Sequence, residues 1–86
     1  MTSPTVSICI PAYNRPEYLK KAIKSVLDQT FYDFELIISD DCSPIDLKLV
    51  VSKYKDQRIK YFRQKSNLGF IKNWNFCLEK CSGKYI

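Results

Sequence analysis

The most distinctive side chains of this 86-residue chain come directly after two short apolar runs. Residues 6–10 are followed by Pro11-Ala12-Tyr13-Asn14, and residues 34–39 by Asp40-Asp41. An aromatic ring can stack on a nucleobase, and a carboxylate can accept a hydrogen bond from a ring N–H such as that of uracil. The two segments together therefore predict a base-binding pocket. Taken alone, the acidic pair could equally cap a following helix, and Tyr13 could be a packing residue.

Two other phosphate-related sites do not fit the sequence. The chain has only two glycines, Gly69 and Gly83, and it lacks both the G-x-G-x-x-G and the Walker A patterns that cradle phosphates. A receiver-like phosphoacceptor site would need acidic residues after the first apolar run as well, where the sequence has only Pro11-Ala12-Tyr13-Asn14. A pocket that recognises a base remains the better interpretation.

The first half of the chain predicts two strands, each followed by a helix. The apolar run 6–10 is a strand that Pro11 should end, and the helix that follows should have Asn14 as its capping residue. Residues 34–39 form the second strand. Ser43-Pro44 should begin the second helix as cap and first residue. The apolar positions of the two helices have helical spacing: Leu19, Ala22, Ile23, Val26, Leu27, and then Leu47, Val50, Val51, Tyr54.

The second half continues the alternation. Residues 59–63 predict a third strand, and residues 67–69 a turn. Gly83 should mark the end of a third helix, and residues 84–86 should begin a fourth strand in which the chain stops. The apolar stripe expected for the third helix is Trp74, Cys77, Leu78 and Cys81.

Strands that alternate with helices predict a parallel α/β sheet with helices on both faces. We therefore expect a Rossmann-like, three-layer fold in one unit spanning residues 1–86, truncated in its fourth strand. Ligands of such sheets bind beyond the carboxyl ends of the strands, where strand order reverses. The loops at Pro11-Ala12-Tyr13-Asn14-Arg15 and Asp40-Asp41 should open onto that edge together.

Composition argues against several other classes. The 14 Lys and Arg residues exceed the 9 Asp and Glu residues, but they are scattered as on a solvated surface, so we expect no nucleic-acid partner. No run approaches the ~20 apolar residues of a membrane span, and no secretory signal precedes the first strand, which predicts a cytoplasmic location. A cytoplasmic location predicts reduced thiols, and the four cysteines without any histidine predict no structural zinc.

The ordered motifs of this chain resemble those of family 2 glycosyltransferases, which have the GT-A fold. The resemblance covers essentially the whole chain in the family's order and spacing. Its motifs are Val6-Ser7-Ile8-Cys9-Ile10-Pro11-Ala12-Tyr13-Asn14-Arg15, Ser25-Val26-Leu27-Asp28-Gln29-Thr30-Phe31, Phe34-Glu35-Leu36-Ile37-Ile38-Ser39-Asp40-Asp41-Cys42-Ser43, Asn67-Leu68-Gly69, Asn73-Trp74-Asn75 and Ser82-Gly83-Lys84-Tyr85-Ile86.

The resemblance implies transfer of a sugar from a nucleotide donor, often a uridine diphosphate sugar, to a glycan or lipid acceptor with inversion. Tyr13 matches the tyrosine beside the base, and Asp41 matches the aspartate that reads the uracil. Asp40, its neighbour, should support the loop. The nucleotide-binding residues predicted in this way are Pro11, Ala12, Tyr13, Asn14, Asp40, Asp41, Asn67, Gly69, Lys72 and Asn75.

The sequence departs from the family pattern in two places. Trp74 stands where many members have an arginine that would contact the diphosphate, although Lys72 could compensate. The family's Asp-x-Asp motif, which holds a Mg²⁺ or Mn²⁺ ion, and its catalytic base would come after residues 84–86. We therefore expect a metal in the full-length enzyme, none held by this chain alone, and no sugar transfer without the general base.

A different class of function remains open. The chain could be a non-catalytic nucleotide-binding module, or it could associate with itself through an exposed sheet edge, because unpaired strand edges favour strand addition. Nucleotide binding by the monomer would distinguish these alternatives.

Overall fold

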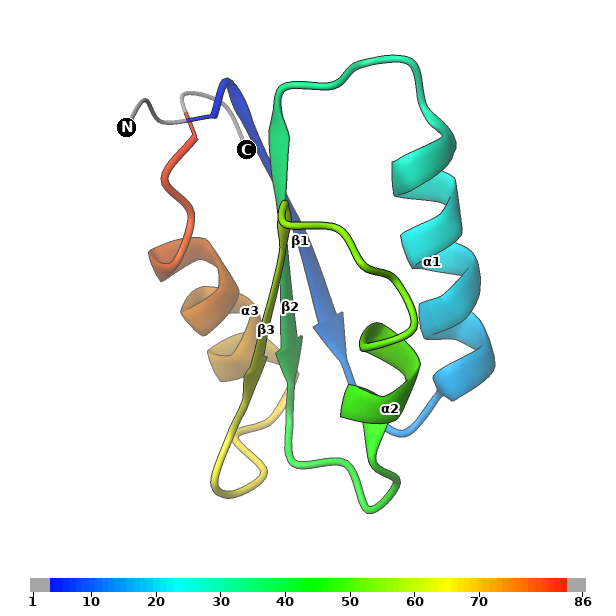
Figure 1. Cartoon of the computed structure of the whole chain (residues 1–86). Helices are drawn as coiled ribbons and strands as arrows, with labels where there is room; N and C mark the ends of the chain where they lie inside the picture. Colours follow the sequence, from blue (N-terminus) through cyan, green and yellow to red (C-terminus); the bar gives the residue numbers. More distant parts are fainter. Residues whose placement is uncertain (1–3, 84–86) are drawn as a thin grey trace.

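The computed structural model describes residues 4–83, and in these residues strands and helices alternate as the sequence predicts (Figure 1). The elements are β1 (Val6–Ala12), α1 (Pro16–Asp28), β2 (Phe34–Asp40), α2 (Leu47–Val51), β3 (Ile59–Arg63) and α3 (Phe70–Glu79). No helix within the described range is long and apolar enough to cross a membrane.

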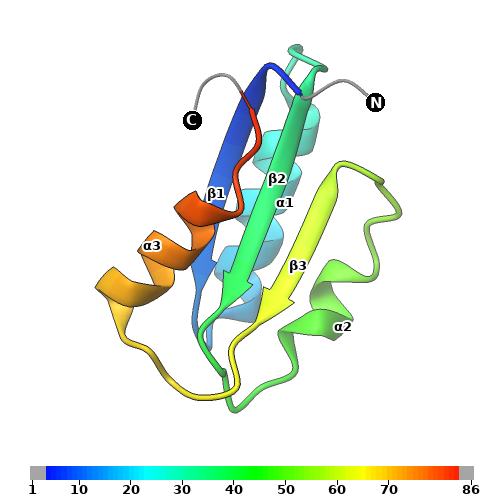
Figure 2. The same cartoon turned by 90° about the vertical axis from the view of Figure 1, so that its left-hand side faces the viewer.

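The three strands form a parallel sheet in the order β1-β2-β3. Helices α1 and α2 lie on one face of the sheet and α3 lies on the other (Figures 1 and 2). The predicted three-layer, Rossmann-like fold is therefore confirmed. The fourth strand expected at residues 84–86 lies outside the described residues, and the strands that are described show no reversal of order.

Strand β2 is the centre of the core because helices cover both of its faces. All seven of its residues are buried. Phe34, Leu36 and Ile38 alternate onto the face that α1 and α2 cover, where they belong to the main apolar cluster. Glu35 and Ser39 alternate onto the α3 face, as period-two side-chain placement requires.

Strand β1 runs two residues further than the sequence suggested. Pro11 does not end the strand, which continues to Ala12. The carbonyl oxygen of Ala12 accepts a hydrogen bond from the Asp41 N–H at 2.9 Å, so the backbone of the preceding Pro11 faces away from β2. Since β1 is an edge strand among the described residues, the missing N–H of proline removes no ladder hydrogen bond.

The starts of α1 and α2 also differ from expectation. Arg15, not Asn14, is the N-cap of α1, and Asn14 instead has a left-handed φ of +50°, which asparagine tolerates. Helix α2 begins at Leu47 rather than at Ser43-Pro44, and its cap is Asp46, whose carboxylate accepts from the Lys48 N–H. The Ser43 side chain is unavailable for capping α2 because it binds Asp40.

Helix α3 presents a different face to the sheet than the one predicted. Cys77 is buried as expected, but Trp74 is 39% exposed and Asn73 takes the buried position instead. The Asn73 amide donates to the Ser39 carbonyl at 2.9 Å and accepts from the Ser39 hydroxyl at 2.6 Å. A pair of polar side chains, satisfied by each other, therefore replaces the apolar contact that periodicity suggested.

The last described residue, Gly83, does not end α3, because that helix stops at Glu79. Its N–H donates to the Ser7 hydroxyl at 2.7 Å, and a Cβ at this position would lie 2.6–2.8 Å from atoms of Ser7 and Val6. The glycine is required because the chain returns closely onto β1.

The Gly83→Ala variant is expected to lower the free energy of unfolding by about 2 kcal/mol, since the added methyl group forces the backbone away from β1. Urea unfolding measures the change. Ser66→Ala is the control, because it removes only a hydroxyl from an exposed position and should change the free energy of unfolding by less than about 0.5 kcal/mol. A Gly83→Ala chain as stable as the parent would contradict the close approach.

Candidate functional site

The loops after β1 and β2 lie in direct contact at the carboxyl edge of the sheet. The strand register pairs Ala12 with Asp40, so the residues that follow leave the sheet side by side. The Asp41 N–H bonds to the Ala12 carbonyl, and the Asn14 N–H donates to the Ser43 hydroxyl at 2.8 Å. The structure therefore brings together the two loops that the sequence predicted would converge.

Asp40 is fully buried at this edge, and its carboxylate is engaged inside the protein. One oxygen accepts from the Ser43 N–H at 3.0 Å and from the Ser43 hydroxyl at 2.5 Å. The other accepts from the Tyr61 hydroxyl at 2.6 Å. Burial, together with this hydrogen bond to the carboxylate, raises the pKa of Tyr61 well above its usual range. Asp40 thus braces the loop after β2 against β3.

Asp41 connects the same loop to the segment in front of α3. Its two carboxylate oxygens accept from the Leu68 N–H at 2.6 Å and from the Gly69 N–H at 3.0 Å, and the Asn67 amide donates to its backbone carbonyl at 3.4 Å. The sequence did not indicate this link. Asp41 is only 4% exposed, but each carboxylate oxygen has two lone pairs and can accept a further N–H.

The two acidic residues do not cap α2, which was the alternative interpretation of the pair. That role belongs to Asp46. Asp40 and Asp41 instead act across the sequence, one on β3 and the other on the turn before α3. Their shared effect is to hold three loops at the carboxyl edge in one arrangement.

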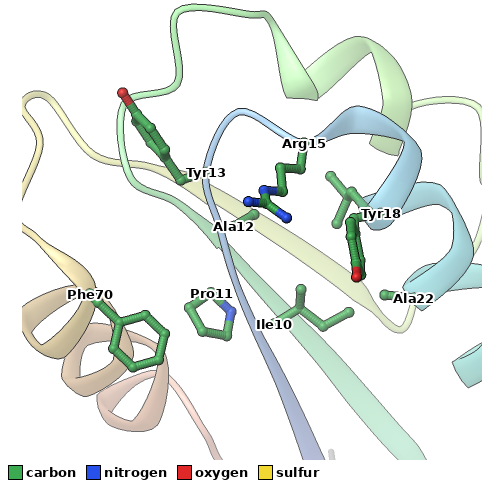
Figure 3. Close-up of a pocket in the computed structure, with 9 residues that line it drawn as sticks. Ile10, Pro11, Ala12, Tyr13, Arg15, Tyr18, Ala22 and Phe70 are labelled. Carbon is green, nitrogen blue, oxygen red and sulfur yellow. The ribbon is translucent and has the colours of Figure 1, made fainter.

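A cavity of about 500 Å³ opens beside the carboxyl end of β1, between the first turns of α1 and α3 (Figure 3). Arg15 and Tyr18 line its α1 side, and Phe70 lines the opposite side. The Arg15 guanidinium lies 5.5 Å from the centre of the Tyr18 ring, a distance suited to a cation–π contact. The complete lining is Ile10, Pro11, Ala12, Tyr13, Arg15, Tyr18, Leu19, Ala22 and Phe70.

Only part of the predicted site lines this cavity. Tyr13, which is 48% exposed, contributes together with Pro11 and Ala12, and its ring points away from Arg15 and Tyr18 (Figure 3). Seven predicted residues do not line it: Asn14, Asp40, Asp41, Asn67, Gly69, Lys72 and Asn75.

Three cavity residues were not among the predicted binding residues: Tyr18 and Phe70, which the sequence analysis did not consider, and Arg15, which it placed in the first loop only. Arg15 and Tyr18 lie at the start of α1, close to the predicted residue Asn14, and Phe70 lies at the start of α3, next to the predicted residue Gly69. Phe70 and Tyr18 are 77% and 69% exposed. For Tyr18 and Phe70, the signal that could have identified them was a large aromatic side chain in the first turn of a helix, at a position outside the buried stripe of that helix.

The carboxylates and thiols of residues 4–83 do not form a metal site. This part of the chain contains no group of three or more His, Cys, Asp or Glu side chains arranged to hold a metal ion. Asp40 and Asp41 are adjacent in sequence, but their oxygens bind different protein donors. These residues do not fit a divalent metal site, and we derive no metal-dependent step from them.

Residues 7–86 match the family model described as Glycosyl transferase family 2. The chain belongs to this family. The family membership predicted from the motifs is thus confirmed over nearly the whole length of the chain.

Two relatives illustrate the chemistry with which family 2 glycosyltransferases are associated. The chain is 43% identical to a GalNAc(5)-diNAcBac-PP-undecaprenol beta-1,3-glucosyltransferase of Campylobacter jejuni, over 96% of this chain and 28% of that protein. It is 35% identical to the putative teichuronic acid biosynthesis glycosyltransferase TuaG of Bacillus subtilis, over 96% of this chain and 34% of that protein.

Solved structures confirm the GT-A fold of this family 2 chain. The structure of S. aureus TarS 1–349 superimposes with a TM-score of 0.85 at 27% identity, covering 95% of this chain and 26% of that one. Mannosyltransferase PcManGT from Pyrobaculum calidifontis, solved with GDP-Man and Mn²⁺, gives 0.82 at 16% identity, covering 94% and 25%. The chain thus spans only 25% to 34% of the proteins compared here.

Proposed function

We propose that this chain recognises the nucleotide of the sugar donor in an inverting glycosyltransferase that acts on a glycan or lipid acceptor. Family membership and the names of the relatives support glycosyl transfer. The relative from Campylobacter jejuni is named for an undecaprenol-linked acceptor, which favours a lipid-linked acceptor here as well. The donor that we propose is a uridine diphosphate sugar.

The observation that carries the proposal is the contact between the Tyr13 loop and the Asp41 loop. Their backbones are hydrogen-bonded through Ala12 and Asp41, so a half-exposed ring and a rigidly held carboxylate occupy the same edge. In this arrangement the Tyr13 ring stacks on the base, and Asp41 accepts the ring N–H of uracil. Pre-organisation lowers the entropy lost on binding, because Leu68 and Gly69 already orient the carboxylate.

The other proposed residues surround this pair. Pro11, Ala12 and Asn14 supply the walls of the first loop, and Asp40 keeps the second loop in place. On the α3 side, the proposed nucleotide contacts are Asn67, Gly69, Lys72 and Asn75. Lys72 and Asn75 are exposed on α3, so their contacts would be made to the outer part of the nucleotide.

Divalent metal use belongs to the proposal for the whole protein. PcManGT was solved with GDP-Man and Mn²⁺, and we propose that the longer protein likewise uses Mg²⁺ or Mn²⁺ to stabilise the leaving diphosphate. Residues 4–83 offer no cluster of ligands for the ion, so the proposal assigns them recognition of the nucleotide and no part in holding the metal. The proposed location of this chemistry is the cytoplasm, at the membrane surface if the acceptor is a lipid.

Titration of uridine diphosphate into the ¹⁵N-labelled chain is expected to shift the amide signals of residues 12–14 and 41–43. Tyr13→Ala is expected to weaken binding about tenfold, because stacking of a base on an aromatic ring contributes on the order of 1–3 kcal/mol. Tyr32→Ala is the matched control, since Tyr32 is 77% exposed at the opposite end of the sheet. Its affinity should equal that of the parent.

The same titration distinguishes the parts of the proposal. Asp41→Asn should reduce the preference for uridine over cytidine diphosphate, because the amide presents both a donor and an acceptor. Added Mn²⁺ should leave the affinity of the chain unchanged. A well-dispersed spectrum that shows no shifts with uridine diphosphate would overturn the proposed function.

A second candidate function is self-association without nucleotide binding. It is favoured by the open edge of β1, which has no partner strand among residues 4–83 and carries the apolar cavity alongside it. Sedimentation equilibrium discriminates between the two: a concentration-dependent dimer that binds no nucleotide supports the second function, and a monomer that binds nucleotide excludes it.

A further inference from the structure

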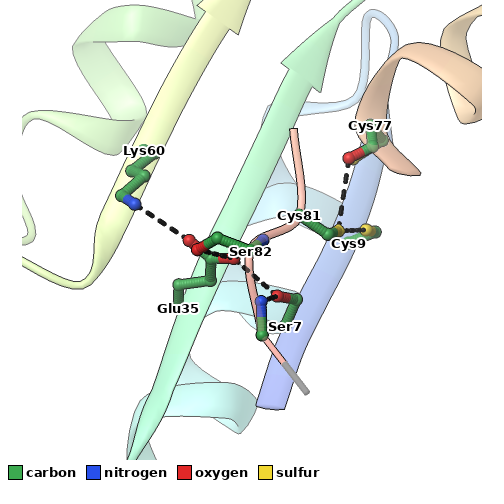
Figure 4. A network of polar contacts seen from close by, with 8 residues as sticks. Ser7, Cys9, Glu35, Lys60, Cys77, Cys81 and Ser82 are labelled. Atoms are coloured by element: carbon green, nitrogen blue, oxygen red, sulfur yellow. Dashed lines mark hydrogen bonds and ion pairs between the residues drawn. The ribbon is translucent and has the colours of Figure 1, made fainter. Parts of the chain in front are cut away.

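Three of the four cysteines gather on the α3 face of the sheet, away from the proposed nucleotide site (Figure 4). The sulfur of Cys9 in β1 lies 3.1 Å from the sulfur of Cys81, which follows α3. The Cys81 thiol also lies 3.3 Å from the carbonyl oxygen of Cys77, the third member. Residues 9 and 81 are far apart in sequence, so only the fold makes them neighbours.

The backbone on both sides of this thiol pair is already held in place. Cys9 belongs to β1, where it pairs with Ile37 of β2. The residue after Cys81 is anchored by Glu35, whose carboxylate accepts from the Ser82 N–H at 2.5 Å and from its hydroxyl at 3.0 Å (Figure 4). The two sulfurs are therefore kept close by contacts that do not depend on the thiols.

We propose that Cys9 and Cys81 form a reversible intramolecular disulfide when the chain meets a low-molecular-weight disulfide such as oxidised glutathione. A disulfide needs sulfurs about 2.05 Å apart, so the pair must close by about 1 Å, which small side-chain rotations can supply. The bond ties the segment after α3 to β1. It is a modification site independent of nucleotide binding.

The reaction is a pair of thiol–disulfide exchanges. One protein thiolate attacks a sulfur of oxidised glutathione, forming a mixed disulfide and releasing one glutathione thiolate. The second protein thiolate then attacks the bonded protein sulfur and releases the second glutathione. The two protein thiols lose two electrons and two protons in total, and oxidised glutathione becomes two reduced molecules.

Geometry selects Cys81 over the other cysteines as the partner of Cys9. Cys77 is completely buried, and its thiol donates to the Ile37 carbonyl oxygen at 3.4 Å. Cys42 lies in the loop after β2, where its thiol faces the Lys65 carbonyl oxygen. Cys9 and Cys81 are both half-buried, so a small oxidant can reach the pair.

The surroundings of the pair also affect its rate of oxidation. Burial raises the pKa of Cys9 to about 11, against the lowering effect of its hydrogen bond with Cys81. Burial, followed by the hydrogen bond with Cys9, raises the pKa of Cys81 to about 11 as well. Because the thiolate is the attacking species, oxidation should be slow at pH 7 and should accelerate about tenfold per pH unit toward pH 9.

The test equilibrates the chain with mixtures of reduced and oxidised glutathione, quenches it with an alkylating reagent, and maps the peptides by mass spectrometry. The expected product is one species that carries two fewer alkyl groups than the reduced chain, with the peptides of Cys9 and Cys81 linked. Cys42→Ser should form the same bond, whereas Cys81→Ser should not. Stable glutathione adducts without a crosslink, or a crosslink through Cys77, would overturn the proposal.

Thermal unfolding of the parent chain tests the same proposal without any substitution. The oxidised parent chain is expected to unfold at least about 5 °C higher than the reduced chain, since the crosslink restricts the unfolded state across a long loop. Reduction by dithiothreitol should reverse the increase. An oxidised chain that melts at or below the temperature of the reduced chain would show that the bond does not fit the native fold, and this too would overturn the proposal.

Discussion

Replacement of Asp40 by alanine is expected to lower the free energy of unfolding by about 3 kcal/mol. The carboxylate is fully buried and accepts three hydrogen bonds. Without it, the Ser43 N–H and the hydroxyls of Ser43 and Tyr61 lose their acceptor, and buried donors without partners are costly. A chain of this length has only roughly 4–13 kcal/mol of stability, so the variant loses a large part of it.

Urea unfolding followed by circular dichroism measures this loss. Asp40→Asn should cost less, about 1 kcal/mol, because its amide oxygen still accepts from Ser43 and its amide nitrogen can donate to the Tyr61 oxygen. Asp46→Ala is the matched control: it removes an exposed carboxylate that caps α2, a change of about 1 kcal/mol. If Asp40→Ala costs no more than Asp46→Ala, the bracing role assigned to Asp40 is wrong.

The second large effect is expected at Glu35, which joins all three strands to the segment after α3. Its side chain is almost fully buried and accepts from Ser7 at 2.5 Å, from Lys60 at 2.9 Å and from Ser82 (Figure 4). Burial alone would raise the pKa of Glu35, but the hydrogen bonds from Ser7, Lys60 and Ser82 outweigh it and lower the pKa to about 2. Glu35→Ala is expected to cost about 3 kcal/mol at pH 7.

The lowered pKa also predicts how stability depends on pH. The folded pKa of about 2 lies below the ordinary value of 4.5, so the contribution of Glu35 is complete above about pH 4.5 and is lost as the pH falls toward 2. Unfolding free energies of the parent chain should therefore decline across this window. In Glu35→Gln, which cannot ionise, the decline should be shallower.

Asp28→Asn serves as the control for this pH series. Asp28 pairs with Lys24 on the surface, and both side chains are more than 60% exposed, so the variant should change stability by less than about 0.5 kcal/mol and should keep the parent's pH profile. Parallel pH profiles of the parent chain and Glu35→Gln would contradict the buried network at Glu35.

Much of the fold could be predicted from the sequence because it depends on local periodicity. The apolar residues Leu36, Ile37 and Ile38 predict the strand β2, and the helical spacing of Leu19 and Ile23 predicts the helix α1; both are seen. Helix starts were predicted less well. The spacing cannot tell whether a side chain such as Ser43 will cap a helix or bind a residue elsewhere, since both uses need the same hydroxyl.

The candidate site was predictable in its outline. A parallel alternation places the ends of β1 and β2 at one edge, and for this reason Tyr13 and Asp41 were expected together. The cavity residues Tyr18 and Phe70 were not expected, and Arg15 was expected only as part of the first loop. Their role depends on how the first turns of α1 and α3 face each other across β1, which no local pattern contains.

By itself, the sequence determined the family, the order of strands and helices, and the two loops at the carboxyl edge, because all three depend on residue types at short spacing. The tertiary structure alone decided how distant polar groups pair: Asp41 with Leu68 and Gly69, Asn73 with Ser39, and Cys9 with Cys81. The physical reason is that a buried donor, acceptor or thiol takes whichever partner the packed layers bring within about 3 Å. That partner is set by the packing of α3 on the sheet and not by distance along the chain.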